Sequence, residues 1–236
     1  MGSDILSDIR RNLESSADEK TKSNSQRFFK EDVKVYGVKT PIVEKIAKRY
    51  FDEIKEKNKK EIFSLCEKLL ESDYCEEAFI AFEWAYSLRK YYDETDFPMF
   101  EGWIEKYVNN WAKCDTLCNH SLGSFIEQFP QYIDSLKAWT RSENRWLRRA
   151  SAVTLILPAR KGKFLNDVFE ICDSLLKDED DLVQKGYGWL LKETSKSHQN
   201  QVFEYIMNNK KDMPRTALRY AIEKLPQDLR DKAMKR

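Results

Sequence analysis

Residues that form turns are scarce in this sequence, which has seven glycines and six prolines among 236 residues. All-β folds and doubly wound α/β folds need frequent glycine and proline turns, so this composition disfavours both classes. Only two histidines occur, and there is no glycine-rich loop of the kind that cradles phosphate. A catalytic triad built on histidine and a P-loop nucleotide site are therefore poor interpretations of this chain.

Long hydrophobic runs and an overall excess of charge are also missing. No apolar segment approaches the ~20 residues that a membrane-spanning helix needs, and no secretory signal is recognisable. The five cysteines are odd in number and scattered, which is typical of reduced thiols in the cytoplasm. We therefore expect a cytoplasmic protein with no membrane association. The net charge of +1 gives no general basic signature, so any signal for nucleic-acid binding must be local.

Metal-ligand spacing is incomplete as well. Cys114 and Cys118 could share one face of a helix, but His120 would point elsewhere, and no second Cys/His pair completes a set of four zinc ligands. The acidic run Asp178–Asp181 lacks the glycine and the spacing of a calcium loop, and it is predicted to form a loop and a helix cap instead. The sequence thus predicts no metal and no other cofactor.

Apolar residues recur at helical spacing along almost the whole chain, and 34% of the residues are charged. This combination is typical of helices with long solvated faces. Thr40 can cap a helix whose first position holds Pro41, where a missing N–H costs nothing. The polar segment Lys20–Gln26 is predicted to be a loop. Helices are predicted over residues 4–21, 41–56, 59–70, 73–91, 97–110, 115–129, 132–140, 144–157, 164–177, 182–195, 199–208, 214–224 and from 229 onward, and no strand is predicted.

These helices form pairs that recur at intervals of roughly 30 to 40 residues, which is the period of helical repeat proteins. The second helix of each pair is expected to begin near Cys75, Cys114, Leu147, Val183 and Pro214. The predicted fold is therefore all-α: an α-solenoid of HEAT-like antiparallel helix pairs, forming a single domain over residues 1–236. The second helices should line its concave surface.

The segment Trp111–Asp115 places an indole and a carboxylate four residues apart, which is one turn if both lie in the same helix. An indole face and an acid on one wall can stabilise a developing cation, the ring through its quadrupole and the acid through its charge. A simpler alternative is that Asp115 caps a helix over residues 116–129, since aspartate is common at that position.

Positive charge concentrates between Arg141 and Lys163, where seven lysines and arginines face one acid, Glu143. Further along, the expected second helices carry Lys185 and Trp189, then Arg215 and Arg219. Their wall would be cationic and aromatic, as binding of phosphates and nucleosides requires. Two glycines, Gly186 and Gly188, lie in the same predicted helix, between Lys185 and Trp189. Glycines in a helix are easier to explain where a neighbouring helix or a ligand packs close to the backbone.

Four motifs in this order resemble the AlkD family of DNA alkylation repair glycosylases. They are Tyr36-Gly37-Val38-Lys39-Thr40-Pro41, Trp111-x3-Asp115, Trp146-Leu147-Arg148-Arg149, and the segment from Gln184 to Glu193. The resemblance covers most of the chain. It implies HEAT-like helical repeats that wrap duplex DNA and excise positively charged N3- and N7-alkylated purines, without a metal and without flipping the base into a pocket.

The resemblance also implies roles for individual residues. Asp115 would be the catalytic carboxylate that stabilises an oxocarbenium-like sugar and positions the water, and Trp111 and Trp189 would flank that sugar and the DNA backbone. The DNA-binding residues would be Arg149, Arg148, Arg145, Lys185, Lys192, Thr40 and Lys39. The expected partner is double-stranded DNA with alkylated bases, bound by a monomer. The alternative function is a non-catalytic HEAT-like repeat module that binds DNA or a protein.

Overall fold

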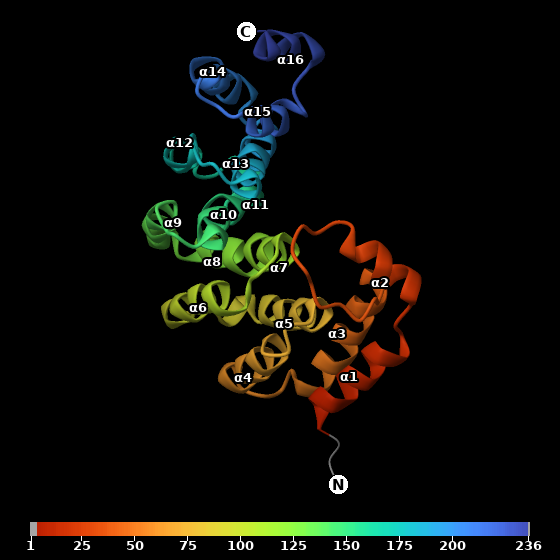
Figure 1. The fold of residues 1–236 in the computed structure, drawn as a ribbon. Coiled ribbons are helices and arrows are strands. Elements are labelled where there is room, and N and C mark those ends of the chain that lie inside the picture. Colours follow the sequence, from red (N-terminus) through yellow and green to blue (C-terminus); the bar gives the residue numbers. More distant parts are fainter. Residues whose placement is uncertain (1–3, 236) are drawn as a thin grey trace. The chain divides into compact units, whose positions relative to one another are not determined.

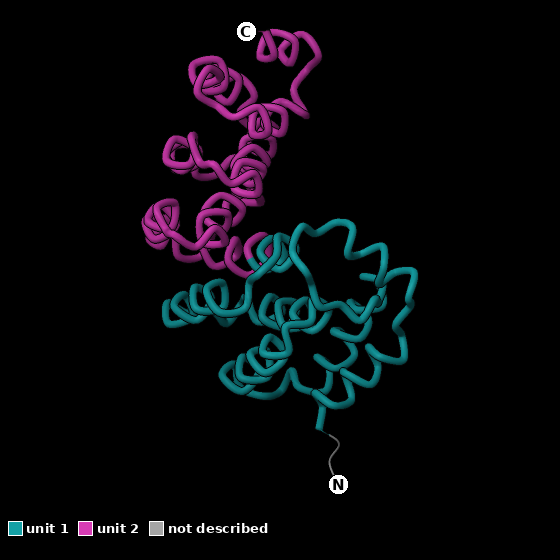
Figure 2. The backbone as a smooth tube through the Cα atoms, in the orientation of Figure 1, with its two compact units in different colours: residues 1–117 teal, residues 118–236 magenta. Residues whose placement is uncertain are grey.

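Every regular element in the described part of the chain, residues 4–235 of the computed structural model, is a helix (Figure 1). This confirms the predicted all-α class. The helices form two compact units, Met1–Leu117 and Cys118–Arg236 (Figure 2). No helix in residues 4–235 is long and apolar enough to cross a membrane.

The first unit consists of seven α-helices packed around an aromatic core. Trp84, Trp103, Phe82 and Phe100 are almost completely buried, and the indole of Trp84 donates a hydrogen bond to the Ala47 carbonyl at 2.8 Å. The helices are α1 (Ile5–Ser15), α2 (Glu19–Gln26), α3 (Thr40–Ile54), α4 (Lys59–Leu70), α5 (Cys75–Ser87), α6 (Phe97–Tyr107) and α7 (Trp111–Thr116), with 3₁₀ turns η1 (Arg89–Tyr91) and η2 (Glu94–Asp96) between α5 and α6.

A π-helical segment, η3 (Leu117–Leu122), follows α7 directly. The second unit then contains α8 (Gly123–Gln128), a 3₁₀ turn η4 (Pro130–Tyr132), α9 (Ile133–Trp139), α10 (Arg145–Val153), α11 (Ile156–Arg160), α12 (Leu165–Leu175), α13 (Asp181–Thr194), α14 (Gln199–Asn209), α15 (Arg215–Ile222) and α16 (Gln227–Met234).

Two layers of helices make up most of the second unit. The helices α10, α13 and α15 pack against one another in one layer, and α9, α12 and α14 cover them in the other (Figure 1). Short connections join successive members of the two layers, which is the stacking that an α-solenoid repeat requires. The predicted starts of the second helices therefore correspond to α5, α7, α10, α13 and α15.

Periodicity placed several boundaries wrongly. The predicted loop Lys20–Gln26 belongs to α2, which has no buried residue and therefore no apolar stripe to reveal it; its signal is the cap Asp18, which accepts the Thr21 N–H at 2.7 Å. Thr40 is the first residue of α3 and not its cap. The predicted helix 144–157 ends early, and Pro158 lies in the first turn of α11, where the missing N–H is tolerated.

Candidate active site and nucleic-acid interface

The short helix α7 carries the indole and the carboxylate that the sequence singled out. Its N-cap is Asn110, whose side chain accepts the Lys113 N–H at 3.0 Å, so the alternative prediction that Asp115 caps a helix is wrong. Trp111 opens the helix and Asp115 lies one turn later, and both side chains are partly exposed. They therefore share one face of α7.

Trp111 is held in place by the segment before α3. Its indole Nε1 donates to the Phe28 carbonyl at 3.2 Å, and its ring stacks on Phe29 with centroids 5.4 Å apart. Beside this stack lies a cavity of about 240 Å³, whose walls are mainly apolar and come from α3, α5, α7 and the segment between α2 and α3. The indole is thus a fixed, partly exposed wall of this cavity and not a core residue.

Lys39 and Thr40 lie exposed at the start of α3, directly after a loop that a buried acid fixes. The Glu76 carboxylate accepts the backbone N–H groups of Tyr36, Gly37 and Val38 at 3.1, 2.9 and 3.1 Å. The Thr40 side chain also lines the cavity beside Trp111. The motif that includes Lys39 and Thr40 therefore positions the start of α3 next to α7.

Glycine is required at one position of this loop. Gly37 has a φ of +92°, and a Cβ there would lie 2.8 Å from the Asp18 carbonyl oxygen and 2.7 Å from the Lys22 Cβ. Its own carbonyl accepts the Asp18 N–H at 3.1 Å, which joins the loop to the start of α2. A side chain at this position would both strain the backbone and push α2 away.

Two of the three residues between Trp111 and Asp115 belong to the core, whereas Ala112 is partly exposed. Cys114 is fully buried, and Lys113 is 1% exposed. The Lys113 ammonium group bonds the Asp73 carboxylate at 2.7 Å and the Asp73 carbonyl at 3.0 Å. Burial alone would raise the pKa of Asp73, but the hydrogen bond and the charge of Lys113 hold it below its usual value. These contacts anchor α7 to the α4–α5 connection.

In the second unit, α13 presents a mixed cationic and aromatic face. Lys185, Trp189 and Lys192 are spaced four and three residues apart, and all three are partly exposed, whereas the residues between them are mostly buried. Lys185 pairs with Asp181 at 2.9 Å. Lys192 pairs with Glu223 at 3.0 Å and lies 5.7 Å from the centroid of the Tyr220 ring. Trp189 is therefore bracketed by two lysines that are already paired with acids.

The arginines of α10 face the acidic loop before α13. Arg145 forms an ion pair with Asp180, the N-cap of α13, and its Nε lies 2.6 Å from the carboxylate. Arg148 bonds Asp178 at 2.7 Å and the Ser142 carbonyl at 2.8 Å. The predicted loop and cap at residues 178–181 are confirmed, and the loop neutralises both arginines.

Arg149 differs from its neighbour because it is only 5% exposed. Its guanidinium donates to the carbonyl of Leu182 at the start of α13. A Cβ at Gly186 would lie 3.4 Å from its Cγ, which is ordinary van der Waals contact, so the arginine packs directly over this glycine. In this structure Arg149 joins α10 to α13.

Comparison with known proteins agrees with this architecture. A model of a family described as DNA alkylation repair enzymes matches residues 9–225. The chain belongs to this family. Among solved structures, a predicted DNA alkylation repair enzyme from Enterococcus faecalis is similar to it, with a TM-score of 0.80 and 16% sequence identity over 90% of this chain and 98% of that one. None of the curated proteins matches the sequence significantly.

Within this family member, the predicted site residues fall into two groups. Trp111, Asp115, Lys39 and Thr40 belong to the first unit, and Trp189 and the predicted cationic residues Arg145, Arg148, Arg149, Lys185 and Lys192 belong to the second. Sequence reasoning missed the two buried acids Glu76 and Glu77, which are 4% and 0% exposed. Two acids in the first turn of a helix usually indicate a solvent-exposed helix end. The one sign in the sequence that these two are buried is the apolar segment that follows them.

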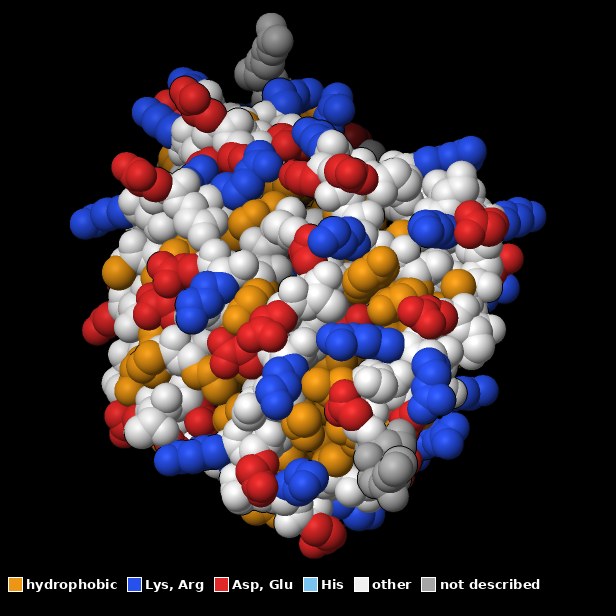
Figure 3. All heavy atoms as spheres, turned by 60° about the horizontal axis from the view of Figure 1, so that its bottom comes forward, with side chains coloured by type: hydrophobic (Ala, Val, Ile, Leu, Met, Phe, Trp, Pro, Cys, Tyr) orange, Lys and Arg blue, Asp and Glu red, His pale blue; other side chains and the backbone are white. Residues whose placement is uncertain are grey.

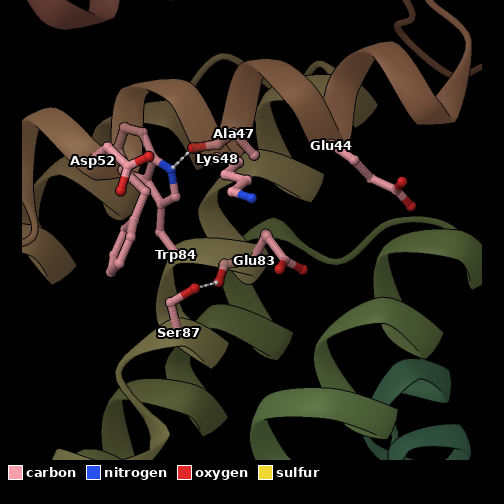
Figure 4. A pocket seen from close by; sticks show the side chains of 8 residues that line it. Glu44, Ala47, Lys48, Asp52, Glu83, Trp84 and Ser87 are labelled. Carbon is pink, nitrogen blue, oxygen red and sulfur yellow. Dashed lines mark hydrogen bonds between the residues drawn. The ribbon is translucent and has the colours of Figure 1, made fainter.

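A second hollow of the first unit is lined by more acids than bases. It holds about 490 Å³ between α3 and α5 and is lined by the acids Glu44, Asp52 and Glu83 and by one lysine, Lys48 (Figure 4). Because acids predominate, it is unsuited to phosphate. No group of three His, Cys, Asp or Glu side chains within residues 4–235 is arranged to hold a metal ion.

Proposed function

We propose that this DNA alkylation repair family member is a monofunctional glycosylase. It hydrolyses the N-glycosidic bond of cationic N3- or N7-alkylated purines in duplex DNA, without flipping the base into a pocket. The observation that carries the proposal is the pairing of Trp111 and Asp115 on one partly exposed face of α7, in a chain whose family is DNA alkylation repair.

The chemistry needs little from the protein because the leaving group is already activated. An alkylated purine carries a positive charge, so the bond from C1′ breaks with its electron pair going to the base, which leaves neutral and needs no general acid. The deoxyribose becomes an oxocarbenium-like cation. A water molecule adds to C1′ and loses its proton to solvent. The residues of the site therefore only have to stabilise the sugar cation and hold the water.

The Asp115 carboxylate performs this stabilisation in the proposal. A unit negative charge about 4 Å from the cation gains about 4 kcal/mol at an effective dielectric near 20. If that interaction arises only in the transition state, it accelerates the reaction roughly a thousandfold. The faces of Trp111 and Trp189 add cation–π attraction to the sugar cation.

Phosphate contacts complete the proposal. Lys39 and Thr40 in the first unit, and Arg145, Arg148, Arg149, Lys185 and Lys192 in the second, hold the backbone of the lesion strand. For the paired cations, a DNA phosphate replaces a carboxylate partner. The two units act together as one HEAT-like domain over residues 1–236, as a monomer in the cytoplasm, and the reaction uses no cofactor.

Base release from defined duplexes tests the function. Duplexes with a single 7-methylguanine, a single O6-methylguanine or no lesion are incubated with the protein, and free bases are quantified. We expect release of 7-methylguanine well above its spontaneous rate and no release of the neutral O6-methylguanine, because no acid activates that base. If 7-methylguanine leaves no faster than in buffer while the duplex is bound, the protein is the non-catalytic DNA-binding module instead.

A further inference from the structure

We propose that Arg215 and Arg219 on α15 form the principal phosphodiester-binding pair of the second unit. This inference rests on the proposed function in one respect, namely that DNA is the partner. It assigns the strongest phosphate contact of this unit to residues outside the motifs Trp146–Arg149 and Gln184–Glu193.

The first observation is the state of the other cations in the layer formed by α10, α13 and α15. Arg145 and Arg148 are paired with Asp180 and Asp178, and Arg149 is buried against the Leu182 carbonyl. Likewise, Lys185 and Lys192 are paired with Asp181 and Glu223. A phosphate that binds any of the paired cations must first displace a carboxylate, which reduces the net gain in free energy.

Arg215 and Arg219 stand apart from this group. Both side chains are exposed, and neither guanidinium has an ion pair or a hydrogen bond to any residue between 4 and 235. They occupy the solvated face of α15, whose opposite face buries Ala217, Leu218, Ala221 and Ile222. A phosphate can therefore bind them without breaking an existing contact.

The pair also lies on the same side of the α13–α15 layer as Trp189. Trp189 shares its helical face with Lys192, three residues later, and Lys192 contacts both Glu223 and the Tyr220 ring. Arg219 lies one turn before Glu223 and next to Tyr220 in α15. Lys192 and Glu223 therefore link the face of α13 that carries the indole to the face of α15 that carries the two arginines.

The spacing and the chemistry of the pair fit a nucleic-acid backbone. Four residues of helix separate the two Cα atoms by about 6 Å along the axis, and each DNA strand carries a phosphate every ~3.4 Å of its axis. Long arginine side chains can therefore reach neighbouring phosphates. A guanidinium group also binds a phosphate through two parallel hydrogen bonds, which a lysine cannot do.

The competing acid on this face is already neutralised. Glu223, one turn beyond Arg219, accepts Lys192 at 3.0 Å and Lys224 at 3.7 Å. It therefore repels an approaching phosphate less than an unpaired glutamate would. The segment from Arg215 to Lys224 carries a local excess of positive charge, since it contains Arg215, Arg219 and Lys224 and a single acid, Glu223.

Equilibrium binding of the full chain to an undamaged duplex, measured by fluorescence anisotropy at several salt concentrations, tests the proposal. For Arg215→Ala with Arg219→Ala we expect at least tenfold weaker binding near 0.1 M salt. The slope of log K against log salt should fall by about 1 to 2, since each lost phosphate contact accounts for roughly 0.9. The double substitution Arg215→Lys with Arg219→Lys should restore the slope but only part of the affinity.

The control removes two exposed charges elsewhere, with Lys57→Ala and Lys60→Ala, and should change the affinity by less than about twofold. Urea unfolding of both variants checks that they are folded. If wild type binds the duplex and the Arg215/Arg219 variant has the same slope and affinity, this inference is wrong while the proposed function stands. If wild type itself fails to bind duplex DNA at low salt, the proposed function is wrong.

Discussion

The burial of Lys113 is the opposite of what its place in the sequence predicts. A lysine between Trp111 and Asp115 would be assigned to solvent, yet it is 1% exposed and bonds Asp73, Asn109 and the Tyr107 carbonyl. The spacing of Trp111 and Asp115 was sufficient to predict that they share a helical face, because that follows from helical geometry alone. The partners of Lys113 could not be predicted, because they come from 4 to 40 residues away.

Asp73 is the residue on which this anchoring depends, and it has a φ of 67°. Asparagine tolerates such a conformation, so Asp73→Asn removes the charge without new backbone strain. At pH 7 we expect the free energy of unfolding to fall by about 1 to 2 kcal/mol, because Lys113 loses its counter-charge and Asp73 is partly solvent-screened. Urea denaturation measures the difference.

The effect should depend on pH in a defined direction. The folded-state pKa of Asp73 is lowered from 3.8, so the ionised form stabilises the fold above that value, and the contribution is lost as pH falls through the lower folded pKa. The difference between wild type and Asp73→Asn should therefore shrink below about pH 4. An unchanged difference at pH 7 and pH 3 would contradict the assignment. The exposed Asp52→Asn is the control, since its pair with Lys55 is largely solvated.

At the scale of the element, apolar periodicity predicted helices well and their interruptions poorly. The starts of α10 and α13 follow from the capping residues Asn144 and Asp180, and those of α5 and α15 follow from their apolar residues alone. The π-helix at Leu117–Leu122 leaves no such trace, because its wider turns do not alter composition. The two glycines of α13 were open to explanation by a ligand or by a neighbouring helix. In the structure, the close approach of α15 accounts for Gly188, whereas a Cβ at Gly186 would meet only ordinary van der Waals contacts.

This difference gives a matched pair of substitutions in one helix. A Cβ at position 188 would lie 2.7 Å from the Ala217 carbonyl oxygen and 2.7 Å from the Tyr220 Cβ, so Gly188→Ala forces α15 away from α13. We expect a loss of about 2 kcal/mol in stability, because overpacking outweighs the better helix propensity of alanine. Gly186→Ala meets the side chains of Arg149 at 3.4 Å and Val153 at 3.6 Å, which are ordinary van der Waals distances, and should be within about 0.5 kcal/mol of wild type. Equal effects in urea denaturation would contradict this packing.

At the scale of the whole molecule, the sequence predicted the number of charges but not which of them form ion pairs. The sequence gives a net charge of +1 and a basic segment from Arg141 to Lys163. In the structure, two arginines of that segment are matched by acids of residues 178–181, and on the face displayed in Figure 3 acidic and basic side chains are intermixed. The sequence alone therefore overstated how much of this charge is available to a phosphate.

Asp178→Asn tests whether this pairing limits DNA binding. The asparagine oxygen can still accept the Asp180 N–H that Asp178 now accepts at 2.9 Å, so the loop should persist while Arg148 loses its counter-charge. We expect the affinity for duplex DNA at about 0.1 M salt to rise roughly three- to tenfold. Asp134→Asn removes an equal charge from a side chain that is 90% exposed, and it should have little effect. No gain for Asp178→Asn over this control would show that the ion pair does not compete with phosphate.

The central claim is that the Asp115 carboxylate stabilises the sugar cation, and its most direct test is the single-turnover release of 7-methylguanine by Asp115→Asn. The substitution keeps the shape of the side chain and removes its charge, and thermal unfolding checks that the variant is as stable as wild type. The account predicts a rate roughly a hundred- to a thousandfold below that of wild type, with duplex affinity unchanged. A rate within about twofold of wild type would contradict it.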